Sequence, residues 1–491
     1  MKRFLFVILA VLCIAAPARA AEPAKVYVIL WFDTEDYILP ASDDAALRVA
    51  DFLTKEGIRA TFKVVGEKAR TLEKRKRDDV IAALKKHEIG YHSNWHSVQP
   101  TPAMYLSNLG WDEGVAEFDR REGPGRADVQ RVFGQAPSCY GQPGSSWGPQ
   151  SFGAMAKWNM KVYLDAGTHV SLDRKPHYFC GALTLYDLEH TLRADLKNPK
   201  LLEAAKEKFA GARKALQAEG GGVVSIYYHP CEFVHKEFWD GANFRAGANP
   251  PRAQWKLPLA QTDEESKRSY AVFEDYIRFI KRFEDVRFIT ASEAAEVYRD
   301  RAQRRQFAFP ELKKIAANVG NELTFQTHDE IALASSEVFY LLNSVVARYS
   351  TGRAVTAFEL PWTPFGPTGT ITDLKEPVLT DWSQFERTAG DVANFLEKQR
   401  RIPSAVWLGS TPVSPEAYLR AVAVVATDLL DGKEPPKSIE IKPTMLAAAK
   451  HVSADDPKLW TWVIFPPGFR APAMMEMAKK QAWTIKPALL R

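Results

Sequence analysis

The segment KVYVILWFDTEDY, residues Lys25 to Tyr37, joins an apolar run to a cluster of carboxylates. Its first part is continuously apolar, which is typical of a buried β-strand. Asp33, Glu35 and Asp36 follow at the point where that strand would end. A buried strand that delivers three carboxylates to one tip predicts a site there, provided that other parts of the chain bring partners to it.

Strand-like and helix-like segments alternate from this segment to about residue 300. Further strands are predicted at RATFKVVG (59–66), EIGYHS (88–93), MKVYLDA (160–166), GALTLYD (181–187), GVVSIYYHP (222–230) and VRFITA (286–291). Amphipathic helical segments separate most of them, and the longest span about 198–219 and 263–283. This alternation predicts an α/β fold with a parallel sheet, and about seven such units indicate a (β/α) barrel. In such barrels the chemistry collects at the carboxyl ends of the strands, where Asp33 and its neighbours would lie.

The composition describes an exported globular protein. The chain has 491 residues, of which 46% are hydrophobic and 25% charged. Residues 1–20 combine a basic start, an apolar run and Ala18-Arg19-Ala20, which predicts a cleaved signal peptide and a periplasmic or extracellular location. An uncleaved anchor is the alternative. Cleavage lowers the net charge from +5 to about +2, which gives no basis for a nucleic-acid partner, and no later segment predicts a membrane span.

Three cysteines remain after the signal: Cys139, Cys180 and Cys231. An exported chain can form one disulfide among them and leave one thiol free. The sequence does not determine which pair forms, or whether any pair does.

Three histidines follow predicted strands. His92 and His96 lie four residues apart in EIGYHSNWHS, and His229 ends the apolar strand IYYHP. Two imidazoles at this spacing can reach one metal ion, and a carboxylate from the first strand would complete an open catalytic set. Alternatively, the pair consists of ordinary polar loop residues. If the barrel closes and the strand that carries His229 lies beside the first strand, His229 approaches Asp33. The two residues would then suit the roles of general acid and general base.

These motifs resemble the polysaccharide deacetylases with the NodB-homology domain. The likeness covers about residues 25–300, and the motifs FDTED, GIRATFKVVGEKA, HSNWH, YGQPGSSW, YLDAG, YYHP and VRFITASE follow the order of the family. The resemblance implies a distorted (β/α) barrel that binds a divalent metal, with zinc as the first choice and cobalt or nickel as alternatives.

Residue by residue, the resemblance also implies roles for the site. His92 and His96 match the metal ligands, with Glu35 as the carboxylate ligand and Asp36 as the alternative, because Thr34 occupies the usual ligand position. The catalytic residues implied are the base Asp33, the acid His229, the orienting carboxylate Asp165 and the oxyanion-binding backbone N–H of Gly144.

One position departs from the family pattern. An arginine that pairs with the catalytic carboxylates is replaced by Gly141. Without it, Asp33 is expected to be held less firmly and to have a higher pKa. The main hypothesis is therefore a metal-dependent hydrolase that removes N-acetyl groups from a polysaccharide or peptidoglycan-like polymer. The alternative is a glycan- or envelope-binding protein that has lost turnover. Trp95 and Trp147 either stack on sugar rings or are packing residues.

The sequence changes character beyond residue 302, so we predict a barrel over 21–302 and a second region over 303–491. SSEVFYLLNSVVA (335–347) and SPEAYLRAVAVVA (414–426) align without gaps and predict two capped helices, each followed by a β-segment that ends at Pro361 or Pro443. The two units faintly resemble pseudomurein-binding repeats. An α/β extension without a binding role is the alternative.

Overall fold

A large curved sheet forms the centre of the computed structural model, which describes residues 24–349 and 356–490. The predicted signal peptide lies outside the described residues. The strands of the sheet are β1 (Val26–Thr34), β2 (Thr61–Val64), β3 (Glu88–Tyr91), β4 (Cys139–Tyr140), β5 (Val162–Leu164), β6 (His177–Phe179), β7 (Ala182–Leu185), β8 (Thr191–Leu192), β9 (Gly222–Tyr228), β10 (Val286–Ile289) and β21 (Lys486–Pro487). The predicted α/β class is therefore correct.

The strand order is β21-β6-β7-β5-β4-β3-β2-β1-β9-β8, with β10 also paired to β1. From β7 to β8 the pairings are parallel, whereas β6 and β21 run antiparallel to their neighbours. In the described part of the chain the two end strands, β21 and β8, do not pair, so the sheet is a curled half-barrel, and the count of about seven units stays a prediction. His229 nevertheless follows a strand that lies beside β1, because β9 pairs directly with β1.

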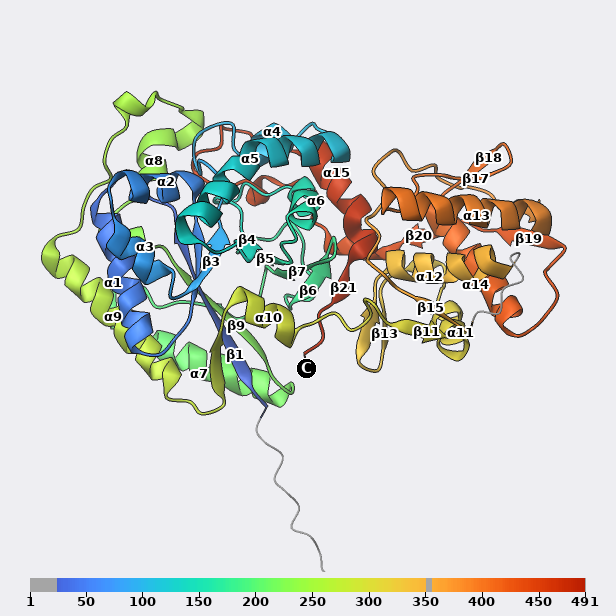
Figure 1. Ribbon diagram of the computed structural model, residues 1–491, viewed down its shortest axis with the longest axis horizontal. Helices are drawn as coiled ribbons and strands as arrows, with labels where there is room; N and C mark the ends of the chain where they lie inside the picture. Colours follow the sequence, from blue (N-terminus) through green and yellow to red (C-terminus); the bar gives the residue numbers. More distant parts are fainter. Residues whose placement is uncertain (1–23, 350–355, 491) are drawn as a thin grey trace, which may run out of the picture.

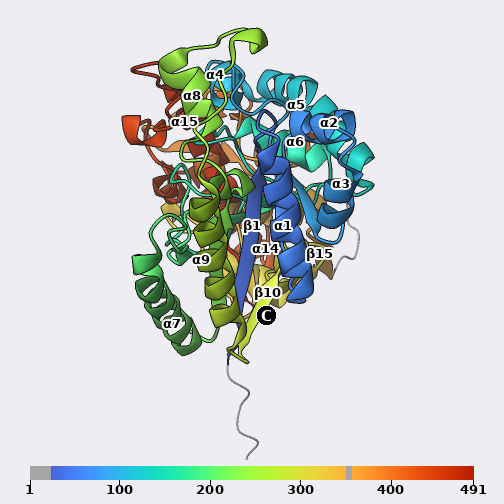
Figure 2. The ribbon, with the colours of Figure 1, turned by 90° about the vertical axis from the view of Figure 1, so that its left-hand side faces the viewer.

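Helices cover the outside of the sheet (Figures 1 and 2). They are α1 (Ala41–Lys55), α2 (Gly66–Lys74), α3 (Asp78–Leu84), α4 (Pro102–Leu106), α5 (Trp111–Phe133), α6 (Gln150–Lys157), α7 (Leu202–Ala218), α8 (Trp239–Phe244), α9 (Asp263–Lys281) and α10 (Ala291–Val297). Thr262 and Glu265 form a capping box at the start of α9. The apolar face of α9 packs on the sheet, with Phe273 against Phe32 of β1.

Residues 306–441 form a smaller lobe with its own hydrophobic core. Two segments of this lobe have the same order of elements, apart from the two-residue strand β12 (Glu322–Leu323), which occurs only in the first. The first contains β11 (Gln306–Ala308), α11 (Phe309–Ala317), β13 (Gln326–His328), β14 (Ile331–Leu333), α12 (Ser335–Tyr349) and β15 (Ala357–Glu359); the second contains β16 (Val378–Asp381), α13 (Trp382–Gln399), β17 (Val406–Leu408), β18 (Thr411–Val413), α14 (Pro415–Leu430) and β19 (Ser438–Ile441). In each segment the middle strands form a hairpin and the outer strands pair antiparallel. Common descent of the two segments stays a prediction.

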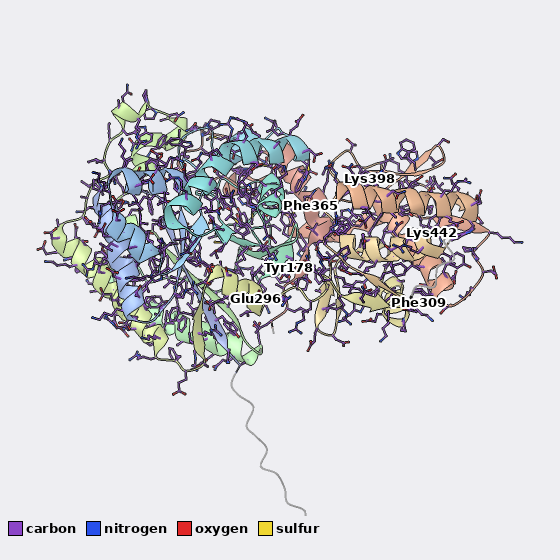
Figure 3. All side chains as sticks on the ribbon, viewed as in Figure 1. Tyr178, Glu296, Phe309, Phe365, Lys398 and Lys442 are labelled. Carbon is purple, nitrogen blue, oxygen red and sulfur yellow. The ribbon has the colours of Figure 1, made fainter. Side chains whose placement is uncertain are left out.

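The end of the chain returns from the small lobe to the large one. Most buried residues from Ala448 to Ile485, including those of α15 (Pro472–Gln481), belong to the core of the large lobe, and β21 extends its sheet, whereas Trp483 packs in the core of the small lobe. Figure 1 shows α15 between the two lobes, and Figure 3 shows Phe365 near the same junction, where its ring meets Trp111 of α5. The predicted region 303–491 therefore includes a segment that packs as part of the barrel lobe.

All three cysteines are buried and free, so no disulfide joins Cys139, Cys180 or Cys231. Within the described ranges, no helix is long and apolar enough to cross a membrane.

We call residues 448–487, which lead the chain back to the large lobe, the returning segment. A buried ion cluster joins this segment to the small lobe. Lys486 Nζ lies 2.7 Å from Asp300 Oδ2 and 2.8 Å from both carboxylate oxygens of Glu337, and its side chain is 1% exposed. We expect Lys486→Met to lower the free energy of unfolding by about 3–5 kcal/mol, because it leaves buried carboxylates without a counter-charge. Urea denaturation measures this loss. Lys433→Met removes an exposed lysine that pairs with Asp428, and should change stability by less than about 1 kcal/mol.

Candidate metal and catalytic site

The carboxyl ends of β1 and β3 bring a carboxylate and two imidazoles together. Because side chains alternate along an extended chain, Asp33 and Glu35 point to the same side. After β3 the chain turns sharply, with Ser93 and His96 in the left-handed region at φ 70° and 55°. This turn returns His96 to the side on which His92 and Glu35 lie. Such left-handed conformations are uncommon for residues other than glycine, although this chain has others outside the site, such as Asn159 and Arg304.

Glu35, His92 and His96 fit a divalent metal. Their ligand atoms lie within 4.8 Å of one another, and all three side chains are buried. Glu35 Oε2 is 2.8 Å from His96 Nε2 and 3.7 Å from His92 Nε2. Each Nδ1 has a separate partner, the Gly141 carbonyl for His92 and the Ser97 hydroxyl for His96, which leaves both Nε2 atoms facing the carboxylate. Two imidazoles and one carboxylate, oriented by outer hydrogen bonds, are the donor set of an open catalytic metal site.

Asp36, the alternative ligand, points elsewhere. Its Oδ1 accepts hydrogen bonds from the backbone N–H groups of Ile38 and Leu39, at 2.9 and 3.1 Å. Its Oδ2 lies 3.6 Å from His235. Asp36 therefore shapes the turn after β1, and the geometry favours Glu35 as the ligand.

A buried lysine, which the sequence analysis did not select, lies between the catalytic carboxylates. Lys63 of β2 has a side chain that is 0% exposed, and its Nζ is 3.0 Å from Asp33 Oδ1 and 2.6 Å from Asp165 Oδ2. It also lies over the ring of Trp31, 4.2 Å from the centroid. Asp33, His92 and Asp165 form a second group of closely spaced ligand atoms. Lys63 already supplies a positive charge between Asp33 and Asp165, so this second set of ligand atoms does not need a metal ion to balance its carboxylates.

Gly141 and Lys63 are complementary. A Cβ at residue 141 would clash with Lys63 Nζ, with Asp165 Oδ2 and with the Leu164 carbonyl. The space that a side chain at 141 would use is therefore filled by the lysine of β2, which is separated from β4 by β3. The expectation that Asp33 is loosely held with a raised pKa is wrong: burial alone would raise the pKa of Asp33, but His92, Lys63 and His229 outweigh burial and lower it. Burial does raise the pKa of Asp165, to about 7.

His229 faces the same site from β9. Its Nε2 is 3.6 Å from Asp33 Oδ2 and 3.9 Å from Glu35 Oε2. Its Nδ1 lies 2.5 Å from Glu232, whose carboxylate also pairs with Arg193. Burial would lower the pKa of His229, but the carboxylates of Glu35, Glu232 and Asp33 outweigh it and raise the pKa to about 9. Glu232 and Arg193 were missed, although His-x-x-Glu spacing in HPCEF is a local signal for such a pair.

The returning segment supplies an aromatic wall to this site. The ring of Trp462 lies against the Cα of Gly144, and its backbone N–H donates to Ser145 Oγ at 3.1 Å. Its Nε1–H donates to Asp240 Oδ2 at 2.6 Å, and its ring meets that of His96 edge-on at 5.2 Å. Trp462 lies about 160 residues beyond the predicted barrel, and no local pattern indicated its position.

Trp95 and Trp147, which the sequence analysis considered as sugar-stacking residues, do not line the catalytic cavity. Trp147 is fully buried and stacks on His169 at 5.0 Å, so it is a packing residue. Trp95 is 43% exposed, but it lines a separate cavity behind His96.

All of the predicted site residues meet at one cavity. A space of about 610 Å³ opens at the carboxyl ends of β1, β3 and β9. Its lining includes the predicted residues Asp33, Glu35, His92, His96, Gly144, Asp165 and His229. The cavity thus brings together a metal-binding set, a carboxylate, an imidazole and a glycine backbone.

No protein-family model matches the sequence, and no curated protein matches it. Solved structures do match. A Mycobacterium smegmatis protein named as a polysaccharide deacetylase is 18% identical, over 57% of this chain and 93% of that chain, with a TM-score of 0.36. Puue allantoinase is 13% identical, over 56% and 91%, with a TM-score of 0.36. A peptidoglycan N-acetylglucosamine deacetylase solved with a benzamide is 15% identical, over 55% and 87%, with a TM-score of 0.30. At these TM-scores the matches say nothing about the activity of this chain, and the resemblance of the small lobe to wall-binding repeats is not among them.

Proposed function

We propose that this protein is an exported, metal-dependent hydrolase that removes N-acetyl groups from a polysaccharide or peptidoglycan-like glycan. The observation that carries the proposal is that three kinds of functional group meet at one cavity. Glu35, His92 and His96 form a metal-binding set, Asp33 is a carboxylate held in place by Lys63, and His229 is an imidazole held by Glu232. Amide hydrolysis needs an activated water, a proton acceptor and a proton donor, and these groups meet that need.

When bound at Glu35, His92 and His96, a divalent metal supplies Lewis acidity that activates water and polarises a carbonyl oxygen. Asp33 accepts the proton of the attacking water at Oδ2, because Oδ1 faces Lys63. The new C–O bond converts the acetyl carbonyl to an oxyanion, and the Gly144 N–H donates a hydrogen bond to it. His229 then donates the proton on Nε2 to the departing nitrogen as the C–N bond breaks. Acetate and a free amine leave the site.

Lys63 weakens the case for a non-catalytic glycan binder. That alternative depended on the absence of an arginine at residue 141, which would leave Asp33 without a cationic partner. Lys63 provides that partner at 3.0 Å, without exposure to solvent. A binder also has no use for a carboxylate and an imidazole placed 3.6 Å apart over a metal-binding set.

The test is metal content and acetate release, measured on one purified sample of residues 21–491. Acetylated chitooligosaccharides and peptidoglycan fragments are the substrates. We expect one metal ion per chain, acetate release that stops when a chelator removes the metal, and recovery when Zn²⁺ or Co²⁺ is added back. Stoichiometric metal with no acetate from any substrate would favour the binder, and no metal binding at all would contradict the assignment of the site.

A further inference from the structure

A second cavity adjoins the catalytic one and is built almost wholly by the returning segment. It has a volume of about 470 Å³ and is formed by residues between 457 and 470, together with Arg245 and Ala246. Arg245, Trp462 and Val463 line both cavities. The two spaces are therefore neighbours that share a wall, and a ligand in one can extend into the other.

This wall is fixed in place. The backbone N–H groups of Ala246 and Gly247 donate to the carbonyls of Val463 and Ile464, at 2.8 and 3.0 Å. Trp462 is also anchored through its Nε1–H to Asp240. Main-chain hydrogen bonds join the segment after α8 to the returning segment. The second cavity is therefore preformed, which is typical of a ligand site.

The lining of the second cavity is aromatic and cationic. Trp460, Trp462, Phe465 and Phe469 contribute rings, and the last two stack at 4.5 Å. Arg245 and Arg470 contribute guanidinium groups, and no carboxylate lines the space. Arg470 pairs with Asp455, whereas Arg245 is exposed and has no ion pair among the residues that the structure describes. Aromatic faces suit the apolar faces of a sugar ring, and a free guanidinium suits a carboxylate.

We propose that this cavity binds the sugar unit next to the N-acetylated one, and that this neighbouring unit carries a carboxylate. The proposal rests on the proposed function, because it takes the acetylated sugar to lie in the catalytic cavity. Arg245 pairs with the carboxylate, and the aromatic rings around Trp462 hold the sugar. A uronic acid and a lactyl-substituted sugar both present such a carboxylate. The substrate is thus an anionic glycan rather than a neutral chitin-like polymer.

The experiment compares one carboxylate-bearing N-acetylated oligosaccharide with its methyl ester, which lacks the negative charge and adds one methyl group. We expect kcat/KM for acetate release, and affinity by titration calorimetry, to be about tenfold higher for the charged form. Arg245→Gln should remove this preference. Val463→Asp, which places a carboxylate at a 42% exposed position of the shared wall, should reverse it. Lys208→Gln, a matched change of an exposed cation on α7, should leave the preference as it is in the parent chain.

Calorimetry separates this proposal from the proposed function, since binding needs no turnover. Tighter binding of the charged form that Arg245→Gln abolishes supports the anionic subsite, even for a chain that releases no acetate. Equal binding of the acid and its ester overturns the subsite, even for an active deacetylase. A preference that survives Arg245→Gln overturns it as well.

Discussion

Neutralising either partner of the Asp33–Lys63 ion pair, in Asp33→Asn or in Lys63→Met, is expected to lower kcat/KM for acetate release by about 10²- to 10⁴-fold. Asp33→Asn removes the proton acceptor. Lys63→Met keeps the length of the side chain but leaves Asp33 and Asp165 facing each other without the cation that lies 3.0 and 2.6 Å from them. Two neighbouring buried carboxylates cannot both stay ionised, so Asp33 would lose its orientation and its charge. Steady-state kinetics on one acetylated oligosaccharide measures both variants.

The control must separate catalysis from stability, because breaking a buried ion pair also costs about 3–5 kcal/mol of folding free energy. Lys68 offers a matched change. Its side chain is 1% exposed, and its Nζ lies 2.5 Å from Asp43 Oδ1 and donates to the backbone carbonyl of Asp36 at 2.6 Å, rather than to Asp33. Lys68→Met should lower the melting temperature much as Lys63→Met does, yet keep kcat/KM within about tenfold of the parent chain at a temperature where both remain folded. Equal kinetic losses in the two lysine variants would contradict a specific role for Lys63.

The complementarity of residues 63 and 141 allows a rescue. Gly141→Arg alone should inactivate the protein, because a Cβ at that position clashes with Lys63 Nζ. Lys63→Ala combined with Gly141→Arg removes the clash with Lys63 Nζ and returns a cation to the same pair of carboxylates, while the backbone at Leu164 must still shift, because its carbonyl also lies where that Cβ would be. We expect the double variant to recover at least about tenfold in kcat/KM over Lys63→Ala. A purely structural role for Lys63 predicts no such recovery.

Local patterns were enough to find the metal-binding set and the longer strands of the sheet, whereas the short strands β4, β6, β8 and β21 were not predicted. The apolar run of β1, the carboxylates after it and the spacing of His92 and His96 are all visible within a few residues. His229 was predicted to approach Asp33 if the barrel closed; the sheet stays open, and the direct pairing of β1 with β9 brings the two residues together. The site could be predicted because its residues follow parallel strands, and the carboxyl ends of parallel strands meet at one edge of a sheet.

Lys63 and Trp462 could not be found in this way. A lysine between Phe62 and Val64 looks like the solvent-facing residue of a strand, and its partner Asp165 is 102 residues away. Only the pairing of β1 with β2 shows that residue 63 lies beside Asp33. Trp462 reaches the site because the chain returns after a complete second lobe, and such a return leaves no periodic signal.

Replacing Glu35 by Ala is expected to abolish metal binding, whereas replacing Asp36 by Ala should retain one metal ion per chain. Glu35 Oε2 lies 2.8 and 3.7 Å from the two imidazole Nε2 atoms, and Asp36 makes backbone hydrogen bonds in the turn after β1. Removal of a ligand should weaken affinity by at least about 100-fold, the upper range seen for loss of an outer-shell partner. Elemental analysis and Zn²⁺ titration of the two purified variants measure this difference.

Asp36→Ala should still affect the protein, through its fold. The loss of a buried carboxylate that accepts two backbone N–H bonds is expected to lower the free energy of unfolding by about 1–3 kcal/mol. Glu35→Ala should also lose stability in the metal-free state, because burial raises the pKa of Glu35 but His96, His229 and His92 outweigh burial and hold it well below its usual range. Metal affinity rather than stability therefore distinguishes the two variants. Metal retained by Glu35→Ala and lost by Asp36→Ala would show that the turn after β1 rearranges to present Asp36, and that the ligand set described by the geometry is wrong.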